Sequence, residues 1–228
     1  MRFGVAISGV PDPVFPEEVA GLEKAGFGSL WFGLDGADWD PIVLASATAM
    51  ATTGAELVVA LAAPTPVTAK SVASLDALCG GRSRILVETA GDAALMRAML
   101  GGDLVGYDGA RFRVVDAPVL PAPVQEQVPI WTRVADLAGR VDGWLATGVE
   151  AYEARAGTVD QACRDVGKDP ALLRRAVLVD ARGRRVTAAL FSVTSGELVR
   201  RLRGVDEVVL QLDRQSWRVA GEVASQIQ

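Results

Sequence analysis

Histidine is absent from the 228-residue chain, and cysteine occurs only twice. Without an imidazole the chain can form no Ser-His-Asp triad and no histidine metal motif, and it lacks the usual acid/base side chain of neutral pH. Cys79 and Cys163 show no C-x-x-C spacing, so we interpret both as packed thiols. We therefore expect no metal site and no histidine-activated nucleophile.

Long apolar runs and basic clusters are also missing. No segment approaches the roughly 20 apolar residues that span a bilayer, and the apolar start of the chain is too short for a signal peptide. The net charge is −5 and the arginine groups are short and interrupted, which argues against binding of nucleic-acid phosphates. We expect a cytoplasmic protein that contacts neither membranes nor nucleic acids.

Short β-branched runs alternate with helical patterns along the whole chain, which is typical of a parallel sheet covered by helices. The predicted strands are 3–8, 29–32, 56–61, 84–88, 128–132, 143–146, 175–180 and 207–212. The predicted helices are 16–25, 41–53, 66–78, 93–100, 133–140, 150–166, 195–202 and 216–226. Eight such units predict a compact (β/α)8 TIM barrel, a single domain over residues 1–228, with the proline-rich stretch 117–123 as a rigid surface connection.

The clearest motif is AKSVASLDALCGGR at 69–82, which predicts a helix that stops at Gly-Gly before a buried strand. Together with FPEEVAGLEKAGFGSLWFG at 15–33 and DGW at 142–144, it resembles the bacterial luciferase-like monooxygenase family. This resemblance implies a TIM barrel, FMN or a deazaflavin as cofactor, and a small organic molecule as substrate. We interpret the charged residues inside these motifs as structural; they are Glu23, Lys70, Asp76 and Arg82.

Candidate site residues follow from the rule that a TIM-barrel active site forms at the carboxyl ends of the strands. The candidate cofactor-binding residues are Ser8, Ala62, Ala63, Glu88, Thr132 and Arg133. The resemblance implies a strained backbone bulge within 59–64 beneath the cofactor ring, which the small Ala62 and Ala63 would suit. Asp35, in a Gly-flanked loop after the second strand, is the candidate catalytic acid; the alternative is an ordinary Asp-Gly turn residue.

Two departures from the family pattern concern the cofactor. The sequence VETAG at 87–91 places Glu88 and Thr89 where the resemblance implies a glycine-rich turn. After the fifth strand, 128–133 leads almost directly into 135–138, without the Gly-Gly loop that implies a phosphate site at a helix start. Arg133 is then either a phosphate contact or a solvated side chain. We expect micromolar or weaker binding of FMN, because each lost charge-assisted hydrogen bond costs roughly 1.5–3 kcal/mol.

Three functions remain open from the sequence. The first is a flavin- or deazaflavin-dependent oxidoreductase or monooxygenase, which rests on the resemblance. The second is a non-catalytic trimmed relative that binds a flavin-like or apolar ligand, or no cofactor, or serves as a partner subunit. The third is a cofactor-free reaction that uses Asp35, Glu88 and Asp213.

The segment 41–53 carries no charged residue, although a helix on the outside of a barrel normally shows a polar stripe to water. We predict a homodimer through this helix, with Ile42, Leu44 or Met50 in the interface, and luciferase-like proteins are similar in pairing through this region. The alternative is that loops of the same chain cover the helix.

Overall fold

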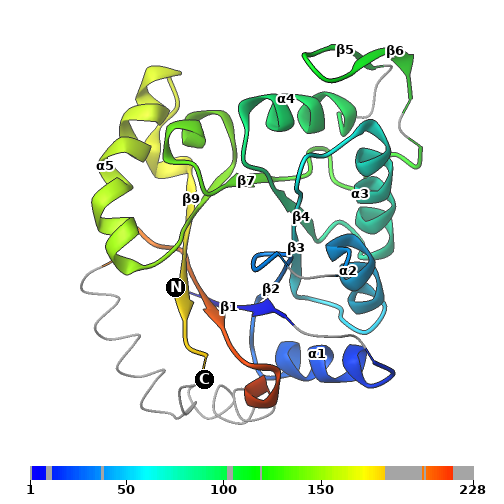
Figure 1. The fold of residues 1–228 in the computed structure, drawn as a ribbon, viewed down its shortest axis with the longest axis vertical. Helices are drawn as coiled ribbons and strands as arrows, with labels where there is room; N and C mark the ends of the chain where they lie inside the picture. The colour runs from blue at the N-terminus through cyan, green and yellow to red at the C-terminus, as the bar shows by residue number, and fades with distance from the viewer. Residues whose placement is uncertain are drawn as a thin grey trace.

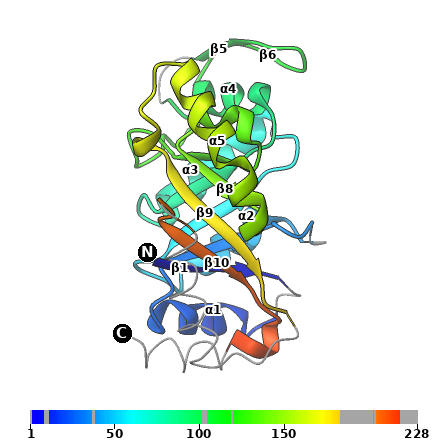
Figure 2. The same ribbon diagram turned by 90° about the vertical axis from the view of Figure 1, so that its left-hand side faces the viewer.

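The computed structural model describes residues 2–8, 12–36, 39–101, 105–118, 120–182, 202 and 204–217. Within these ranges eight parallel strands form one closed barrel with helices outside it (Figures 1 and 2). The strands are β1 (Arg2–Ile7), β2 (Ser29–Phe32), β3 (Glu56–Ala60), β4 (Ser83–Leu86), β7 (Ile130–Thr132), β8 (Gly143–Ala146), β9 (Arg174–Asp180) and β10 (Glu207–Gln211), paired in this order, with β10 returning to β1. The predicted TIM barrel is confirmed, with every strand boundary within two residues of its expected place.

The helices follow the strands around the outside. They are α1 (Phe15–Lys24), α2 (Pro41–Ala49), α3 (Pro66–Leu78), α4 (Ala90–Met99) and α5 (Val149–Asp165), with short 3-10 turns η1 (Ala135–Arg140), η2 (Pro170–Leu172) and η3 (Arg214–Ser216). The prolines start α2 and α3 as expected, and side-chain caps help: Asp40 accepts the backbone N–H of Ile42 at 2.8 Å, and Thr65 forms a capping box.

Several predictions about the helices need correction. The segment after β7 was expected to be a helix, but only the 3-10 turn η1 forms, because the connection to β8 is too short for a full helix. Helix α2 ends at Ala49 rather than at the predicted Thr53, because the chain turns toward β3 after Ala49. The predicted helices 195–202 and 216–226 lie largely outside the described residues. Within the described ranges no helix is long and apolar enough to cross a membrane.

Between α4 and the predicted surface connection 117–123 the chain forms an antiparallel hairpin, β5 (Val105–Asp108) and β6 (Arg113–Ala117), which the sequence did not predict. It projects beyond α3 and α4 in Figure 1. The sequence signal was weak because the hairpin is short and its turn, at Gly109–Phe112, lies among charged residues.

Large side chains and a buried charge cluster fill the barrel interior. Trp31 and Trp131 meet edge to face, with ring centroids 5.3 Å apart, and both are fully buried. At the amino ends of the strands Arg84 forms ion pairs with Glu56 and Glu207. Burial and the charge of Arg174 lower the pKa of Arg84, and the carboxylate of Glu207 opposes this. These internal pairs close the amino end of the barrel.

Three of the four charged motif residues have the structural roles that we predicted. Glu23 accepts the backbone N–H groups of residues 53–55, and Arg82 donates to the carbonyls of Thr52, Ala55 and Cys79. Asp76 is fully buried and accepts N–H groups from residues 124 and 125. All of these contacts lie on the amino side of the strands. These contacts hold the outer helices and the chain before β7 in place at the amino end of the barrel. The carboxyl end, where we expect the active site, takes no part in them.

Candidate active site at the carboxyl ends of the strands

Alternation along the strands points two charged side chains into the mouth of the barrel. Leu86 on β4 and Trp131 on β7 belong to the interior cluster, so the side chains two residues later face the same way. These are Glu88 and Arg133. Arg133 Nε donates to Glu88 Oε1 at 2.6 Å, and its Nη1 donates to the carbonyl of Leu34 at 3.3 Å. Arg133 therefore bridges the loops that follow β2, β4 and β7.

Trp144 holds the backbone of this arginine in place. Its indole Nε1 donates to the carbonyl of Arg133 at 3.3 Å, and its ring stacks on Tyr152 of α5 at 5.4 Å. Trp144 is buried, at 1% exposure. The DGW motif thus does more than fill the core, because its tryptophan fixes the loop that carries Arg133.

A cavity of about 460 Å³ lies beside Arg133, between η1 and the start of α5. Its lining residues are Arg133, Val134, Ala135, Asp136, Trp144, Ala146, Thr147, Ala151 and Arg155. Helix α5 begins after Gly148, which has φ +124° and no side-chain cap, so first-turn N–H groups are left without a capping side chain. The guanidinium groups of Arg133 and Arg155 and the start of α5 favour binding of an anion in this cavity. The carboxylates of Asp136 and of Glu150 in the first turn of α5 oppose it.

A second cavity, of about 530 Å³, lies between the starts of α2 and α3. It is lined by Gly33, Gly36, Trp39, Asp40, Pro41, Ile42, Ala60, Leu61, Ala62, Val67, Thr68 and Ser71. Most of these residues are apolar or small. Both cavities fall within the 300–1,000 Å³ range usual for small-molecule sites. Gly33 lines this cavity, and the next residue, Leu34, accepts a hydrogen bond from Arg133 through its carbonyl. Arg133 therefore lines the first cavity and contacts a loop that contributes to the second.

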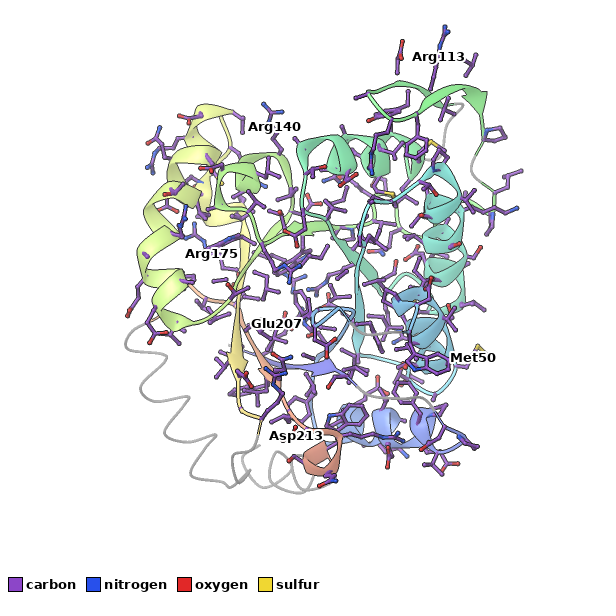
Figure 3. The ribbon with its side chains drawn as sticks, viewed as in Figure 1. Met50, Arg113, Arg140, Arg175, Glu207 and Asp213 are labelled. Carbon is purple, nitrogen blue, oxygen red and sulfur yellow. The ribbon has the colours of Figure 1, made fainter. Side chains whose placement is uncertain are left out.

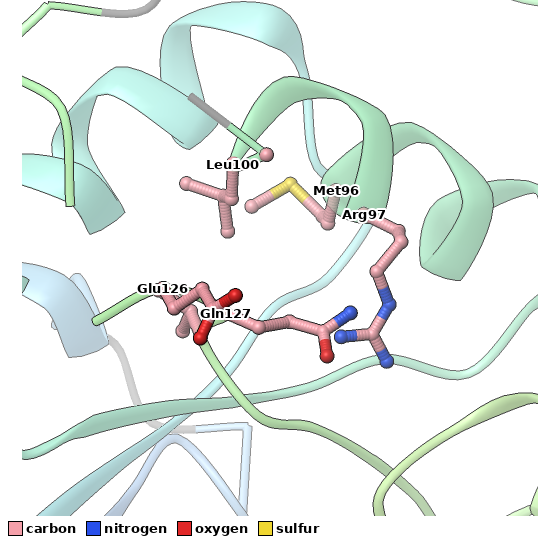
Figure 4. A pocket seen from close by; sticks show the side chains of 7 residues that line it. Met96, Arg97, Leu100, Glu126 and Gln127 are labelled. Carbon is pink, nitrogen blue, oxygen red and sulfur yellow. The ribbon is translucent and has the colours of Figure 1, made fainter. Parts of the chain in front are cut away.

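A third cavity, of about 470 Å³, lies away from this face (Figure 4). Met96 and Leu100 near the end of α4 line one side, and the chain at Glu126 and Gln127 lines the other. These residues lie at the amino end of β7, opposite the carboxyl ends. We therefore leave this cavity out of the candidate active site.

The remaining candidate residues occupy different positions on the carboxyl face. Ser8 is half-buried just after β1, whereas Ala62 and Ala63 are exposed after β3. Ala63 has φ +52°, the only described non-glycine residue with positive φ, so the loop does hold a strained backbone. Thr132 is fully buried and its hydroxyl accepts the N–H of Val134 at 3.1 Å, so this side chain supports the loop.

Asp35 is exposed in the turn after β2. Arg182 is bound by both oxygens of Asp180, at 3.0 and 2.6 Å, and these hydrogen bonds raise its pKa, with smaller contributions from the charges of Asp213 and Asp35. Asp35, Asp180 and Asp213, at the ends of β2, β9 and β10, thus all act on the charge of Arg182. No group of three potential metal-ligating side chains occurs within the part of the chain that the structure describes.

The sequence pointed to Glu88 and Arg133, which the structure brings together, but it missed Arg155 and Trp39. The pair Thr147-Gly148, between the end of β8 at Ala146 and a 17-residue helix, was an available signal for the cavity at α5. Trp39 carried no comparable signal, because an aromatic residue in a loop is usually packed.

No family model and no curated protein matches the chain in sequence. An F420-dependent secondary alcohol dehydrogenase, solved with an F420–acetone adduct, matches with a TM-score of 0.75, 16% identity and 98% coverage of both chains. A monooxygenase from Streptomyces bottropensis matches with a TM-score of 0.74, 16% identity and coverage of 99% of this chain and 98% of the other.

A third solved structure contains FMN. It is the oxygenating constituent of 3,6-diketocamphane monooxygenase of Pseudomonas putida, with a TM-score of 0.60 and 14% identity, covering 89% of this chain and 74% of the other. At these identities the likeness establishes the fold. The resemblance to luciferase-like proteins is confirmed at that level.

Proposed function

We propose that the chain is a flavin- or deazaflavin-dependent oxidoreductase of the luciferase-like type that acts on a small organic substrate. The observation that carries this proposal is Arg133, which lines the cavity at α5 and hydrogen-bonds the loop of the cavity between α2 and α3. A flavin or deazaflavin requires an apolar surface for its planar ring and donors for its phosphate. The cavity between α2 and α3 offers the first of these environments, and the cavity at α5 offers the second.

The residues present fit such a cofactor. Gly33, which has no side chain, and the small Ala60 and Ala62 leave room beside an apolar wall. The guanidinium groups of Arg133 and Arg155 can donate to a phosphate. The strained backbone at Ala63 agrees with the bulge that the family resemblance implies. When bound, the cofactor would supply hydride or oxygen chemistry, which explains how a chain without histidine could be an enzyme.

The protein's own groups would bind and orient. Arg133 is held by Glu88, so its charge is partly neutralised before any ligand arrives; an incoming anion would compete with that carboxylate. Both side chains are about one-third exposed, so their ion pair is worth at most about 1 kcal/mol and can rearrange. Glu88 and the exposed Asp35 are the candidate groups that hold or release a proton at the mouth.

Titration with FMN and with F420, followed by absorbance and fluorescence, tests the proposal. We expect one of them to bind with micromolar affinity and Arg155→Ala to weaken binding at least about tenfold, the loss of one charge-assisted hydrogen bond. Arg140→Ala is the matched control, because Arg140 is exposed on η1 and points outward in Figure 3. Absence of binding of either cofactor at millimolar concentration would refute the proposal.

A second function, a non-catalytic relative that binds the cofactor or a flavin-like ligand, is favoured by one observation. The loop after β7 is only two residues long before η1 begins at Ala135, so the phosphate would rely on Arg155 and the start of α5. The distinction is measurable: a catalyst oxidises the reduced cofactor faster in the presence of substrate, whereas a binding protein leaves this rate unchanged.

For the partner we propose a second copy of the chain on the surface of α2 and α3. Leu44 is buried inside the subunit, which removes it from the expected interface. Val43, Met50 and Val67 are instead 61–74% exposed, and Figure 3 shows Met50 at the outer surface. An isologous pairing that covers these side chains would bury about 800 Å² on each subunit.

Light scattering tests the dimer. We expect the unmodified protein to be dimeric at micromolar concentration and Met50→Arg to be monomeric, because a charge would then be buried without a partner. Val166→Arg, at another exposed apolar position, is the control and should stay dimeric. An unmodified protein that is monomeric would overturn the dimer.

A further inference from the structure

The β5–β6 hairpin is attached to the rim of the barrel through side chains near its turn. The turn is closed by the N–H of Gly109, which donates to the carbonyl of Phe112 at 3.0 Å. On one strand the hydroxyl of Tyr107 donates to the carbonyl of Gly91 at the start of α4, at 3.3 Å. Although the hairpin projects outward in Figure 1, side chains at its turn end therefore contact the carboxyl face.

Arg111, in the turn, contacts two rim loops at once. Its Nη2 donates to the carboxylate of Asp92, at the start of α4, and to the carbonyl of Pro64, in the loop after β3, at 3.5 Å. The Asp92 side chain is only 6% exposed, so a cation is needed to balance its buried charge. Arg111 supplies that cation and ties the loops after β3 and β4 together.

The Pro64 carbonyl directly follows the strained residue of the rim. Ala63 adopts φ +52°, a conformation in which its Cβ crowds the backbone, so neighbouring contacts must hold it there. Pro64 itself is buried, whereas Ala62 and Ala63 are exposed. Ala62 also lines the cavity between α2 and α3.

We propose that Arg111 is a positioning residue for this rim: from the hairpin it fixes the left-handed loop at Ala63 against α4 and so shapes the wall of the neighbouring cavity. We call the link that Arg111 makes between Asp92 and Pro64 the clamp, and it follows directly from these two contacts. Its consequence for a ligand rests on the proposed binding of a flavin or deazaflavin, so the clamp and its consequence require separate measurements.

Hydrogen exchange of the protein without cofactor tests the clamp. In Arg111→Met, which keeps most of the apolar stem but loses the charge, we expect the hydrogen-bonded amides of Leu61 and Thr65 to exchange about tenfold faster or more. Arg111→Lys should restore protection, because one nitrogen carries both bonds in Arg111 and an ammonium has three donors. Arg113→Met is the matched control, since Arg113 is exposed on the same hairpin and points outward in Figure 3.

The Ala63→Gly background provides a further check. Glycine adopts positive φ without strain, so the loop should then depend less on Arg111, and Arg111→Met should accelerate exchange by less than about threefold. The clamp is refuted if Arg111→Met exchanges like the unmodified protein, if Arg113→Met has the same effect, or if Arg111→Lys gives no protection beyond that of Arg111→Met.

Cofactor titration of the same variants tests the positioning role. We expect Arg111→Met to weaken binding of FMN or F420 about tenfold and Arg111→Lys to recover most of the loss, in parallel with exchange. If exchange changes but affinity does not, the clamp exists without positioning the site, and the positioning role is overturned. If the unmodified protein binds neither cofactor, the proposed function and this positioning role both fail, while the exchange data still decide the clamp.

Discussion

Gly143 on β8 leaves space that Trp131 on β7 occupies, and Gly143→Ala should disrupt this packing. A Cβ at residue 143 would lie 2.2 Å from two atoms of the indole ring, whereas carbon atoms pack at roughly 3.5–4.0 Å. The ring would have to move by more than an ångström. It is fully buried, with Trp31 at 5.3 Å and the guanidinium of Arg84 at 5.4 Å from its centroid. The ring therefore has little room to shift.

We expect Gly143→Ala to lower the free energy of unfolding by about 3 kcal/mol, the upper part of the usual overpacking range. For a chain of this size that corresponds to a fall in Tm of about 6–12 °C. Circular dichroism during thermal and urea unfolding measures both quantities. Gly21→Ala is the control: a Cβ there meets nothing within 4 Å, so alanine in α1 should stabilise by about 0.5–1 kcal/mol. A loss below 1 kcal/mol at residue 143 would refute this account of the barrel interior.

Three further substitutions probe charged groups. Burial raises the pKa of Glu23, but backbone N–H donors outweigh this and hold the pKa below its ordinary value. The stabilisation by its carboxylate is therefore present above about pH 4.5 and is lost as pH falls through the lower folded pKa. Urea unfolding of Glu23→Gln should show a free energy of unfolding about 1 kcal/mol lower at pH 7, and this difference should vanish near pH 3. Asp76→Ala should cost about 3 kcal/mol or more in the same assay, because buried donors, including Ser83 at 2.7 Å, lose their acceptor. Glu88→Gln should change stability by less than about 1 kcal/mol, since its pair with Arg133 is partly exposed, yet alter cofactor affinity in titration.

The barrel could be predicted because its strands are locally consistent. Runs such as SLWF in β2 are buried on both sides and bounded by glycine, so their length and place are visible in the sequence. Turns and caps added to this, as at Pro66 and Gly80 around α3. Because eight parallel strands close a TIM barrel, the closed barrel could be predicted from the number of strands.

The hairpin and η1 could not be predicted for a different reason. The hairpin is stabilised by contacts with distant residues, above all Arg111 with Asp92 and Tyr107 with Gly91, and such contacts leave no periodic pattern. In η1, the apolar residues Ala135 and Ala138 are buried at helical spacing, but the connection between β7 and β8 leaves no length for a helix.

The candidate site could be predicted from the sequence only in part, because it too depends on contacts between residues that are distant in the chain. Glu88 and Arg133 lie where predicted strands end, so the rule that a TIM-barrel site forms at the carboxyl ends of the strands was enough to find them. Their ion pair was not foreseeable, because it depends on the spacing of two neighbouring strands. Arg155 lies two turns into α5, and its place beside Arg133 depends on how that helix packs against η1.

The two ends of the barrel differ in what their charges can do. At the amino end, Arg84 and Glu207 are fully buried and paired, so a ligand could reach them only after the loss of internal ion pairs. At the carboxyl end, Arg133 and Glu88 are about one-third exposed, and exchange of their partner for a ligand costs little. Substitutions at the rim can therefore change binding with small effects on folding, whereas those at the amino end should change folding first. Measuring both quantities for each variant separates a functional rim from a structural base.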